Sequence, residues 1–198
     1  MKLLAFVDLH GSHKALEEIK KKSKKADMIL CAGDVSIFEN DLQSILHQLN
    51  KLNKKVLIIP GNHESGIDIT MLAKPFKNIV NIHKKLLVHS DIVFLGYGGG
   101  GFSMVDKQFE KISKKMERDI KKNKGKKVIL ITHAPPYKTK IDKIMEEHCG
   151  NKSIKRFILK IKPDLVISGH LHENAGKHDK IEKTKVINPG PFGKIISI

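Results

Sequence analysis

The stretch Val56-Leu57-Ile58-Ile59-Pro60-Gly61-Asn62-His63-Glu64 decides how the rest of the chain is interpreted. Its first four residues form a short, branched apolar run, which predicts a buried strand that ends abruptly in a turn. Gly61 can adopt backbone angles that other residues avoid, so we expect a sharp bend there. An amide, an imidazole and a carboxylate follow in consecutive positions. Alone, they would form an ordinary polar loop, and their meaning depends on the other polar stretches.

The first part of the chain alternates apolar runs with helical patterns. The runs 2–7, 28–32 and 56–59 predict strands. Ser12 can cap a helix that runs to about Lys25, and Asn40 or Asp41 can cap a second helix. In that second helix, leucine and isoleucine recur at helical spacing, at Leu42, Ile45, Leu46, Leu49 and Leu52. The order strand, helix, strand, helix, strand predicts parallel pairing with right-handed crossovers.

The pattern changes near Ile79. Short apolar segments at 79–83, 86–89 and 92–97 predict strands, with Ser90-Asp91 as a hairpin turn. Gly98 to Gly101 is not followed by the helix of a dinucleotide fingerprint, so we interpret it as a flexible strand exit at the rim of a site. The remaining elements are a helix over 109–120, a strand at 128–132, a long polar loop to Gly150, a helix capped by Asn151 or Ser153, a strand at 165–168 and two closing strands at 185–190 and 194–198.

The composition is that of one globular domain over residues 1–198, with 40% hydrophobic residues and 5% aromatic ones. No run approaches the roughly 18 apolar residues of a membrane span, so we expect no membrane partner. The segment after Met1 is too short for a signal peptide. Cys31 and Cys149 fit a reducing compartment, and we therefore expect a cytoplasmic protein. The sequence does not indicate an oligomeric state.

The formal net charge of +16 has two interpretations. One is a nucleic-acid partner, and the other is a lysine-rich solvated surface that attracts anionic substrates. The basic residues are mostly lysines in helices and turns, such as 20–25 and 121–127, and no aromatic residues are interleaved with them. This pattern favours the solvated surface, and nucleic acid is kept as the alternative partner.

Five predicted strands end in residue types that bind metals, namely Asp8 with His10, Asp34, Asn62, His133, and His170 with His172. In open α/β sheets, sites form outside the carboxyl ends of the strands, so these residues can converge. The i, i+2 spacing of the two pairs would place both side chains on the same side of an extended backbone. A single such residue commonly bonds to nearby backbone, but that explanation does not suit all five strand ends together. They predict one shared site.

In this order, the polar blocks resemble the calcineurin-like metallophosphoesterases. That family shows D-x-H, G-D, G-N-H-[DE], a later lone H and G-H-x-H, and this chain has Asp8-Leu9-His10, Gly33-Asp34, Gly61-Asn62-His63-Glu64, His133 and Gly169-His170-Leu171-His172. The blocks together span residues 8–172. The resemblance implies an α/β fold, a four-layer α-β-β-α sandwich of two mixed sheets with helices outside.

The resemblance also implies a pair of divalent metal ions as cofactors. One ion would be held by Asp8, His10, Asp34 and His172, and the other by Asp34, Asn62, His133 and His170. Two such ions about 3.5–4 Å apart need a shared anionic ligand, which is Asp34 here, and they can supply a bridging hydroxide at neutral pH. Mixed imidazole and carboxylate ligation suits manganese, iron, zinc, cobalt or nickel and does not choose between them.

Asn62 and His63 would bind the substrate, and His63 would be the catalytic proton donor to the leaving oxygen, a role that suits an imidazole at pH 7. The alternative for His63 is a hydrogen bond to a nearby carboxylate, from Glu64 or Asp34. Lys138, Lys140 and the loop 146–153 are further candidates to line the pocket.

Departures from the family pattern narrow the function. Protein Ser/Thr phosphatases carry phosphate-clamping arginines after G-D and before G-N-H-E, but this chain has Val35-Ser36-Ile37-Phe38-Glu39 and Pro60 there. What remains resembles a small stand-alone phosphoesterase (a phosphodiesterase or phosphatase) that hydrolyses a small phosphodiester or phosphomonoester. The alternatives are a metal-dependent nuclease and a non-catalytic scaffold of the same fold, and the presence of His63 argues against the scaffold.

Overall fold

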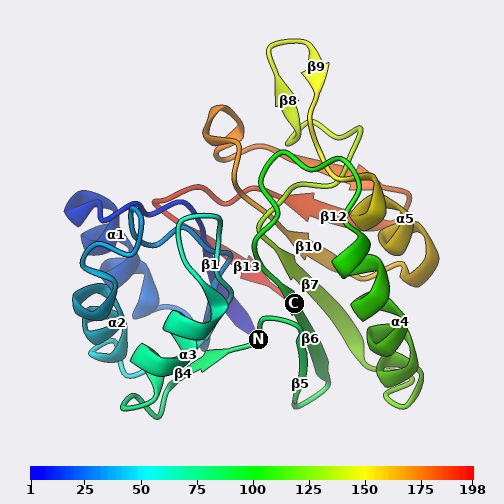
Figure 1. Cartoon of the computed structure of the whole chain (residues 1–198). Coiled ribbons are helices and arrows are strands. Elements are labelled where there is room, and N and C mark those ends of the chain that lie inside the picture. Colours follow the sequence, from blue (N-terminus) through cyan, green and yellow to red (C-terminus); the bar gives the residue numbers. More distant parts are fainter.

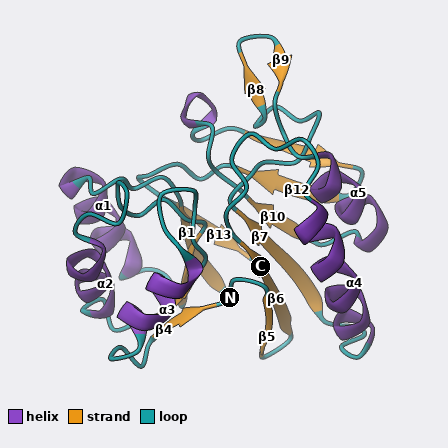
Figure 2. Cartoon of the chain, viewed as in Figure 1, coloured by secondary structure: helices purple, strands orange, loops and turns teal.

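In the computed structural model, which describes residues 1–198, two mixed sheets pack face to face and helices cover both outer faces (Figures 1 and 2). The strand order is β13-β1-β2-β3-β4 in the first sheet and β11-β12-β10-β7-β6-β5 in the second. This confirms the four-layer α/β fold that the resemblance implies.

The first sheet contains β1 (Lys2–Phe6), β2 (Met28–Cys31), β3 (Lys55–Ile58) and β4 (Ile79–Asn81), all parallel, with β13 (Lys194–Ser197) antiparallel to β1. The helices α1 (His13–Ser23), α2 (Leu42–Asn50) and α3 (Gly66–Ala73) cover its outer face (Figure 1). The Ser12 side chain accepts a hydrogen bond from the backbone N–H of Ala15, which confirms the predicted cap of α1. Asp41 precedes α2 as predicted, but its side chain makes no capping bond.

Two expectations for residues 66–83 are wrong. Helix α3 is absent from the predicted elements, because its short and largely apolar sequence lacks the spacing of an amphipathic helix. The change of sequence pattern near Ile79 suggests a new set of strands there, but β4 still pairs in parallel with β3. Helix α3 supplies the crossover between β3 and β4, so the parallel pattern continues for one more strand than the sequence indicates.

The second sheet contains β5 (Lys85–His89), β6 (Ile92–Tyr97), β7 (Lys127–Thr132), β10 (Leu165–Ile167), β12 (Thr184–Ile187) and β11 (His178–Ile181). The helices α4 (Lys107–Lys121) and α5 (Lys152–Ile161) cover its outer face (Figure 1). The hairpin turn at Ser90-Asp91 is confirmed, because His89 pairs with Ile92. The Asn151 side chain caps α5 by accepting from the N–H of Ile154, also as predicted.

The two predicted closing strands are β12 and β13, which join different sheets. The predicted long polar loop contains a small hairpin of β8 (Lys143–Ile144) and β9 (Glu147–His148). The edge strand β11 and a 3-10 turn, η1 (His172–Asn174), are absent from the predicted elements, because both are polar. A polar edge strand has no apolar alternation by which the sequence could reveal it.

Strand β1 shows why the two sheets pack together. Leu3, Ala5 and Val7 contribute to the core between the sheets, whereas Leu4 and Phe6 contribute to the core under the helices, and all five are fully buried. Burial on both faces explains why this strand is a continuous apolar run. Each large side chain so buried stabilises the fold by roughly 1.5–3 kcal/mol relative to exposure.

The parallel strands end level with one another. Phe6 pairs with Cys31, and Cys31 pairs with Ile58, so the loops after β1, β2 and β3 open at the same edge of the first sheet. In the second sheet, β7 and β10 are parallel neighbours in which Ile131 pairs with Ile167. The five loops that carry the predicted site residues therefore follow strands whose carboxyl ends lie side by side within each sheet.

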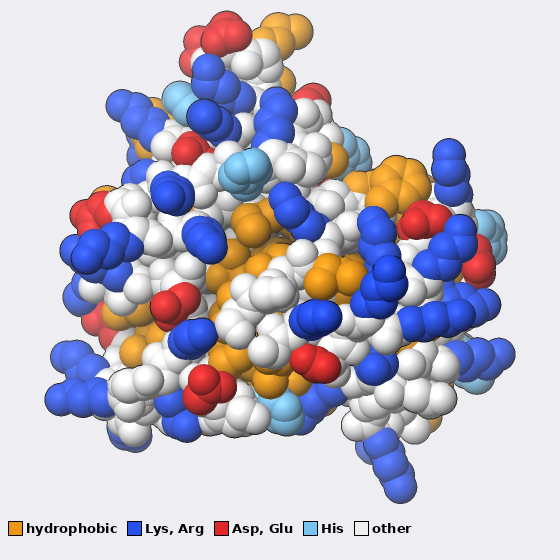
Figure 3. Space-filling model, turned by 180° about the vertical axis from the view of Figure 1, so that it is seen from behind, with side chains coloured by type: hydrophobic (Ala, Val, Ile, Leu, Met, Phe, Trp, Pro, Cys, Tyr) orange, Lys and Arg blue, Asp and Glu red, His pale blue; other side chains and the backbone are white.

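The surface carries its charge without one dominant patch on the face drawn in Figure 3. Lysine and arginine side chains surround this face with acidic side chains among them, and hydrophobic side chains lie near its centre (Figure 3). None of the helices has the length and apolar character needed to cross a bilayer.

Candidate metal centre

Two glycines let the loops of the site approach closely, Gly61 within the first sheet and Gly169 between the two sheets. A Cβ on Gly61 would lie 1.8 Å from Oδ1 of Asp34, and a Cβ on Gly169 would lie 2.1 Å from the Val7 side chain and 2.9 Å from Oδ2 of Asp8. Gly61 is not among the glycines with a left-handed φ. The residue is needed there for close approach of the backbone to Asp34.

Four residues of the site have left-handed backbone angles, with φ of 55° at Asp8, 45° at His10, 51° at Asp34 and 71° at His170. The expectation of an extended backbone in the two i, i+2 pairs is therefore wrong. Such angles are uncommon outside glycine and cost on the order of 1 kcal/mol or more each. They aim the side chains from tight turns at the strand ends into one space between the sheets.

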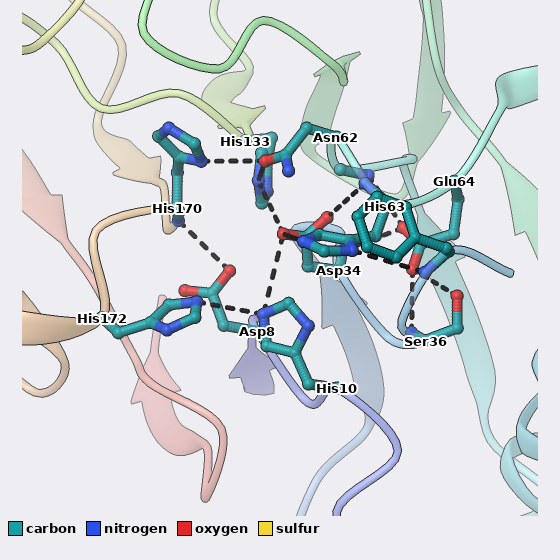
Figure 4. Close-up of polar contacts among 12 residues, drawn as sticks. Asp8, His10, Asp34, Ser36, Asn62, His63, Glu64, His133, His170 and His172 are labelled. Carbon is teal, nitrogen blue, oxygen red and sulfur yellow. Dashed lines mark hydrogen bonds and ion pairs between the residues drawn. The ribbon is translucent and has the colours of Figure 1, made fainter. Parts of the chain in front are cut away.

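Asp34 lies at the middle of this space (Figure 4). Its Oδ2 atom is 3.3 Å from Nε2 of His133, 3.7 Å from Nε2 of His10 and 4.0 Å from Nε2 of His63. Burial favours the neutral carboxyl, but the hydrogen bond and positive charge of His133 outweigh it and lower the pKa of Asp34 to about 2. Asp34 is therefore an anion at neutral pH, shared among three imidazoles.

A second group gathers around Asn62, whose Oδ1 atom is 3.0 Å from Nε2 of His133 and 2.9 Å from Nδ1 of His170. Nδ1 of His133 lies 2.9 Å from the carbonyl oxygen of Ala32, which only accepts, so this nitrogen carries a proton. Nε2 of His133 thus faces two oxygen atoms, of Asn62 and Asp34. This arrangement is favourable only if Nε2 is protonated or shares a cation with them.

The two neighbouring histidines differ in the direction in which their pKa values are shifted. Burial disfavours the charged ring of His133, but the carboxylate of Asp34 more than compensates and raises its pKa. His170 behaves in the opposite way, because burial and the neighbouring His133 lower its pKa to about 4. Its Nε2 is the only buried side-chain nitrogen or oxygen in the chain without a hydrogen-bond partner. His170 is therefore neutral at pH 7, and the only side-chain hydrogen bond of its ring is the one from Nδ1 to Asn62.

The third group joins Asp8, His10 and His172, with 3.0 Å between the Nε2 atoms of the two imidazoles. Burial raises the pKa of Asp8 and lowers the pKa of His10. Oδ1 of Asp8 also accepts the backbone N–H of His170 at 3.2 Å, which ties this group to the second sheet. The donor set of imidazoles, carboxylates and one amide oxygen fits divalent metal ions of the manganese-to-zinc series.

The structure thus brings all eight predicted site residues into one cluster, Asp8, His10, Asp34, Asn62, His63, His133, His170 and His172 (Figure 4). Three subsets have ligand atoms within 4.8 Å of one another and could each hold a metal: Asp8, His10 and His172; Asp8, Asp34 and His133; and His10, Asp34 and His63. The last subset includes His63, which the resemblance places outside the metal ligands. The division of ligands between two ions stays a prediction.

The contacts of His63 define its tautomer. Its Nδ1 accepts a hydrogen bond from the backbone N–H of Phe38 at 3.3 Å, so the neutral ring carries its proton on Nε2. Its backbone N–H donates to Oδ1 of Asp34 at 3.0 Å. Of the two carboxylates considered as partners, Glu64 makes no contact with the ring, and Asp34 lies 4.0 Å from Nε2. The Nε2 proton therefore faces the cluster.

Glu64 has a structural role that its residue type alone does not predict. It is buried, and its Oε2 accepts from the backbone N–H groups of Asp34 and Gly61, both at 3.0 Å. Its Oε1 accepts from the N–H and hydroxyl of Ser36, both at 2.8 Å. One carboxylate thus fixes the loop of Asp34 against the loop of Asn62. Its position next to Asn62-His63 is the only signal for this role in the sequence.

Two exposed phenylalanines, Phe38 and Phe102, also lie at the cluster, and the sequence pattern does not predict this position. The Phe38 ring lies 4.5 Å from the His63 ring, and the Phe102 ring lies 4.7 Å from the His170 ring, measured between centroids. Phe102 follows the predicted glycine-rich strand exit, in which the N–H of Gly99 donates to the carbonyl of Pro60. In the sequence, each phenylalanine is only an isolated apolar residue in a loop, without the periodicity of a strand or helix that would have indicated its place.

The predicted pocket lysines are not joined to the cluster. The Lys138 ammonium lies over the Tyr137 ring, and the Lys138 and Lys140 N–H groups donate to Asp142 and Asp179. The loop 146–153 includes β9, whose His148 pairs with Asp142.

Comparisons with known proteins agree with this geometry. The sequence model of the calcineurin-like phosphoesterase family matches residues 1–174. The uncharacterized protein MJ1162 of Methanocaldococcus jannaschii is 31% identical over 202 residues, which cover 96% of this chain and 88% of that protein.

Two solved structures share the fold. The protein TT1561 of Thermus thermophilus superposes with a TM-score of 0.75 at 19% identity, over 96% of this chain and 88% of that one. A dimetal phosphatase from Danio rerio superposes with a TM-score of 0.66 at 10% identity, over 94% and 86%. The family match over residues 1–174 shows that the chain belongs to the calcineurin-like phosphoesterase family.

Proposed function

We propose that residues 1–198 form a single-domain phosphoesterase that uses two divalent metal ions to hydrolyse a small phosphodiester or phosphomonoester. The observation that carries the proposal is the arrangement around Asp34. One buried anion is shared by imidazoles from both sheets, with the amide oxygen of Asn62 beside His133. The similarity to a protein described as a dimetal phosphatase supports the same assignment.

The proposed ligands are Asp8, His10, Asp34 and His172 for one ion and Asp34, Asn62, His133 and His170 for the other. Bound ions of this kind lower the pKa of water towards 7 and offset the negative charge of a phosphate. Asp34 contributes the negative charge that lets two cations lie close together. The Ala32 carbonyl holds the His133 proton on Nδ1, which leaves Nε2 directed at Asp34 and Asn62.

Two side chains can act on the substrate itself. The Nδ2 group of Asn62 makes no hydrogen bond within the chain, and Asn62 is exposed, so this group can donate to a phosphate oxygen. His63 can donate its Nε2 proton to the leaving oxygen, because Nδ1 already accepts from Phe38. Transfer of that proton at the moment of bond cleavage would stabilise an alkoxide leaving group.

The test combines metal content with turnover. The chelated protein is reloaded with manganese, iron, zinc, cobalt or nickel, and bound metal is counted. It is then assayed on monoesters, cyclic nucleotides, dinucleotides and DNA. We expect two ions per chain and hydrolysis that is lost with chelation and restored by at least one metal. Zero or one ion at saturating manganese would contradict the dinuclear proposal. Full occupancy without turnover of any phosphoester would contradict the enzymatic one.

A further inference from the structure

Phe38 and Phe102 are unusual among the eight phenylalanines of the chain, because they are 74% and 65% exposed. Most of the others lie in the core or against it. Each of the two exposed rings contacts an imidazole of the metal centre, Phe38 through His63 and Phe102 through His170. Two exposed rings in contact with one polar cluster differ from apolar residues scattered singly over a surface, which need no explanation.

The two rings contact different histidines of the cluster. In Figure 4, His170 lies to one side of Asn62, whereas His63 lies beside Asp34. Phe102 contacts the first of these histidines and Phe38 the second, so two exposed aromatic side chains adjoin the cluster at different histidines. A phosphoester bound at the ligands would extend its two substituents towards these rings.

The backbone of Phe38 adds to the argument. Its φ is 47°, and Glu39 and Asp41 in the same loop have φ of 65° and 57°. A left-handed conformation is a genuine outlier for a bulky residue and persists at functional sites where it positions a group. Phe38 also donates its N–H to His63, so the conformation that orients this histidine holds the ring beside it.

Phe102 offers a flat apolar face to a ligand. Its ring contacts the imidazole of His170, whose Nε2 is buried and out of reach of a bound molecule. A ligand at this end of the cluster therefore gains its contacts from the exposed face of the Phe102 ring. Nucleobases suit such a face, because every base has a flat π-face that can stack on an aromatic side chain.

We infer that Phe38 and Phe102 form a base-binding subsite and that the substrates are small nucleotide phosphodiesters. This inference rests on the proposed hydrolytic function. The phosphate would lie at the metal ligands, and the bases would pack against the two rings. Stacking of a base on an aromatic side chain is sequence-tolerant and contributes enough to change affinity about 5-fold to 100-fold. The net charge of +16 favours such anionic substrates over neutral ones.

The first experiment varies the bases while the scissile bond is kept constant. A deoxydinucleotide and its two analogues that lack one base are compared by kcat/KM with manganese, so the scissile bond and the type of leaving oxygen are the same. We expect the wild type to favour the complete dinucleotide by at least about fivefold for each base. Phe38→Ala and Phe102→Ala should each remove the preference for one base, and Phe38→Tyr should retain it.

Phe192→Ala is the matched control. Phe192 is 44% exposed, and its carbonyl is bonded to Lys22 in the last turn of α1, so it tests the loss of an exposed ring elsewhere. This variant should keep the wild-type preference. Equal kcat/KM for all three substrates in the wild type, or a preference that survives both alanine variants, would overturn the subsite.

The second experiment measures binding and does not need turnover. Adenosine 5′-monophosphate and ribose 5-phosphate are titrated by calorimetry into the wild type and the same variants. We expect the nucleotide to bind at least about fivefold more tightly and this difference to shrink in the alanine variants. A base-dependent affinity without hydrolysis would uphold the subsite and contradict the proposed function. Hydrolysis without any effect of the base would uphold the proposed function and contradict the subsite.

Discussion

Asp34 and Phe38 are four residues apart in one loop, but Asp34 is 2% exposed and Phe38 is 74% exposed. Both have left-handed backbones, with φ of 51° and 47°. Asp34 belongs to the site floor, which we define as Asp34, Glu64 and His133, all buried. Phe38 belongs to the site rim, which we define as Phe38 and Phe102.

The difference lies in what stabilises each region. In the floor, backbone N–H groups and the Glu64 carboxylate compensate for the strained angle of Asp34. In the rim, the Phe38 side chain contacts only the His63 ring among aromatic groups and is otherwise open to solvent. We infer that the floor is built to keep its geometry without a ligand, whereas the rim gains most of its contacts from a ligand.

The largest expected effect is that of Asp34→Asn. The substitution keeps the shape of the side chain but removes the anion that His10 and His133 share, so both metal positions should lose occupancy and activity should fall to that of the chelated protein. His133→Ala is the comparison and should mainly empty one position. Metal analysis after gel filtration measures both. Normal binding of two ions to Asp34→Asn would show that Asp34 is not the shared ligand.

His63→Ala tests the boundary between floor and rim. The ring is directed at the cluster by Phe38, so the variant should retain both metals while turnover falls by about 10²–10⁴-fold, the range of a lost proton donor. The loss should be larger for an alkyl phosphoester than for a nitrophenyl ester, because nitrophenolate leaves without a proton.

The exposed residue His13 provides the control for this variant. His13→Ala should behave as the wild type with both esters. Equal losses with both esters in His63→Ala would reduce His63 to a phosphate-binding residue. Loss of metal in His63→Ala would instead place it among the ligands, as the subset of His10, Asp34 and His63 allows.

Glu64→Gln should have a smaller effect, which acts through the position of Asp34. An amide at this position would turn an NH₂ group towards backbone N–H donors, with the loss of charge-assisted hydrogen bonds. We expect the free energy of unfolding to decrease by about 1.5–3 kcal/mol and the metal affinity to weaken. Ser36→Ala removes one donor only and should cost about 0.5–1.5 kcal/mol. Urea denaturation of the chelated proteins separates the two, and equal stabilities would contradict the role of Glu64.

The sequence predicted the floor better than the rim for a physical reason. Asp34, Asn62 and His133 directly follow apolar strands, and parallel strands must end at the same edge, so their convergence follows from strand order. The turns that aim them could not be predicted, because left-handed angles at Asp8 and His10 have no signature in residue type. The bonds of Glu64 depend on the approach of two loops, which only the folded chain reveals.

The secondary structure could be predicted from apolar patterns alone, so only elements with such a pattern were found. Buried strands such as β1 and β7 are continuous apolar runs that periodicity detects. The polar edge strand β11 and the short helix α3 lack such a pattern, since tertiary contacts determine their structure. Phe38 and Phe102 could not be assigned to the site, because a lone apolar residue in a loop carries no period at all.

The smallest expected effect concerns His83, which holds the start of the loop that carries the rim residue Phe102. Nδ1 of His83 accepts the N–H of Gly98 at 2.8 Å, at the start of the glycine-rich loop that leads to Phe102. Burial, with Lys84 and Lys85 nearby, lowers the pKa of His83 to about 4. The unfolded chain takes up this proton below its ordinary pKa of 6.5, whereas the folded chain does so only near pH 4. This contribution to stability is therefore complete above about pH 6.5 and is lost as the pH falls from 6.5 to 4.

His83→Asn tests this anchor, because Oδ1 of asparagine can take the place of Nδ1 but does not titrate. Between pH 7 and pH 5, the wild type should lose about 1 kcal/mol more stability than His83→Asn, a figure reduced for the partial exposure of the ring. His13→Asn, which replaces an exposed histidine, should follow the wild type. Urea denaturation at both pH values measures the difference. The wild type and His83→Asn share every other titrating group. If both lost the same stability between pH 7 and pH 5, His83 would already accept a proton in the folded chain at pH 5. The glycine-rich loop would then not be held by a neutral histidine.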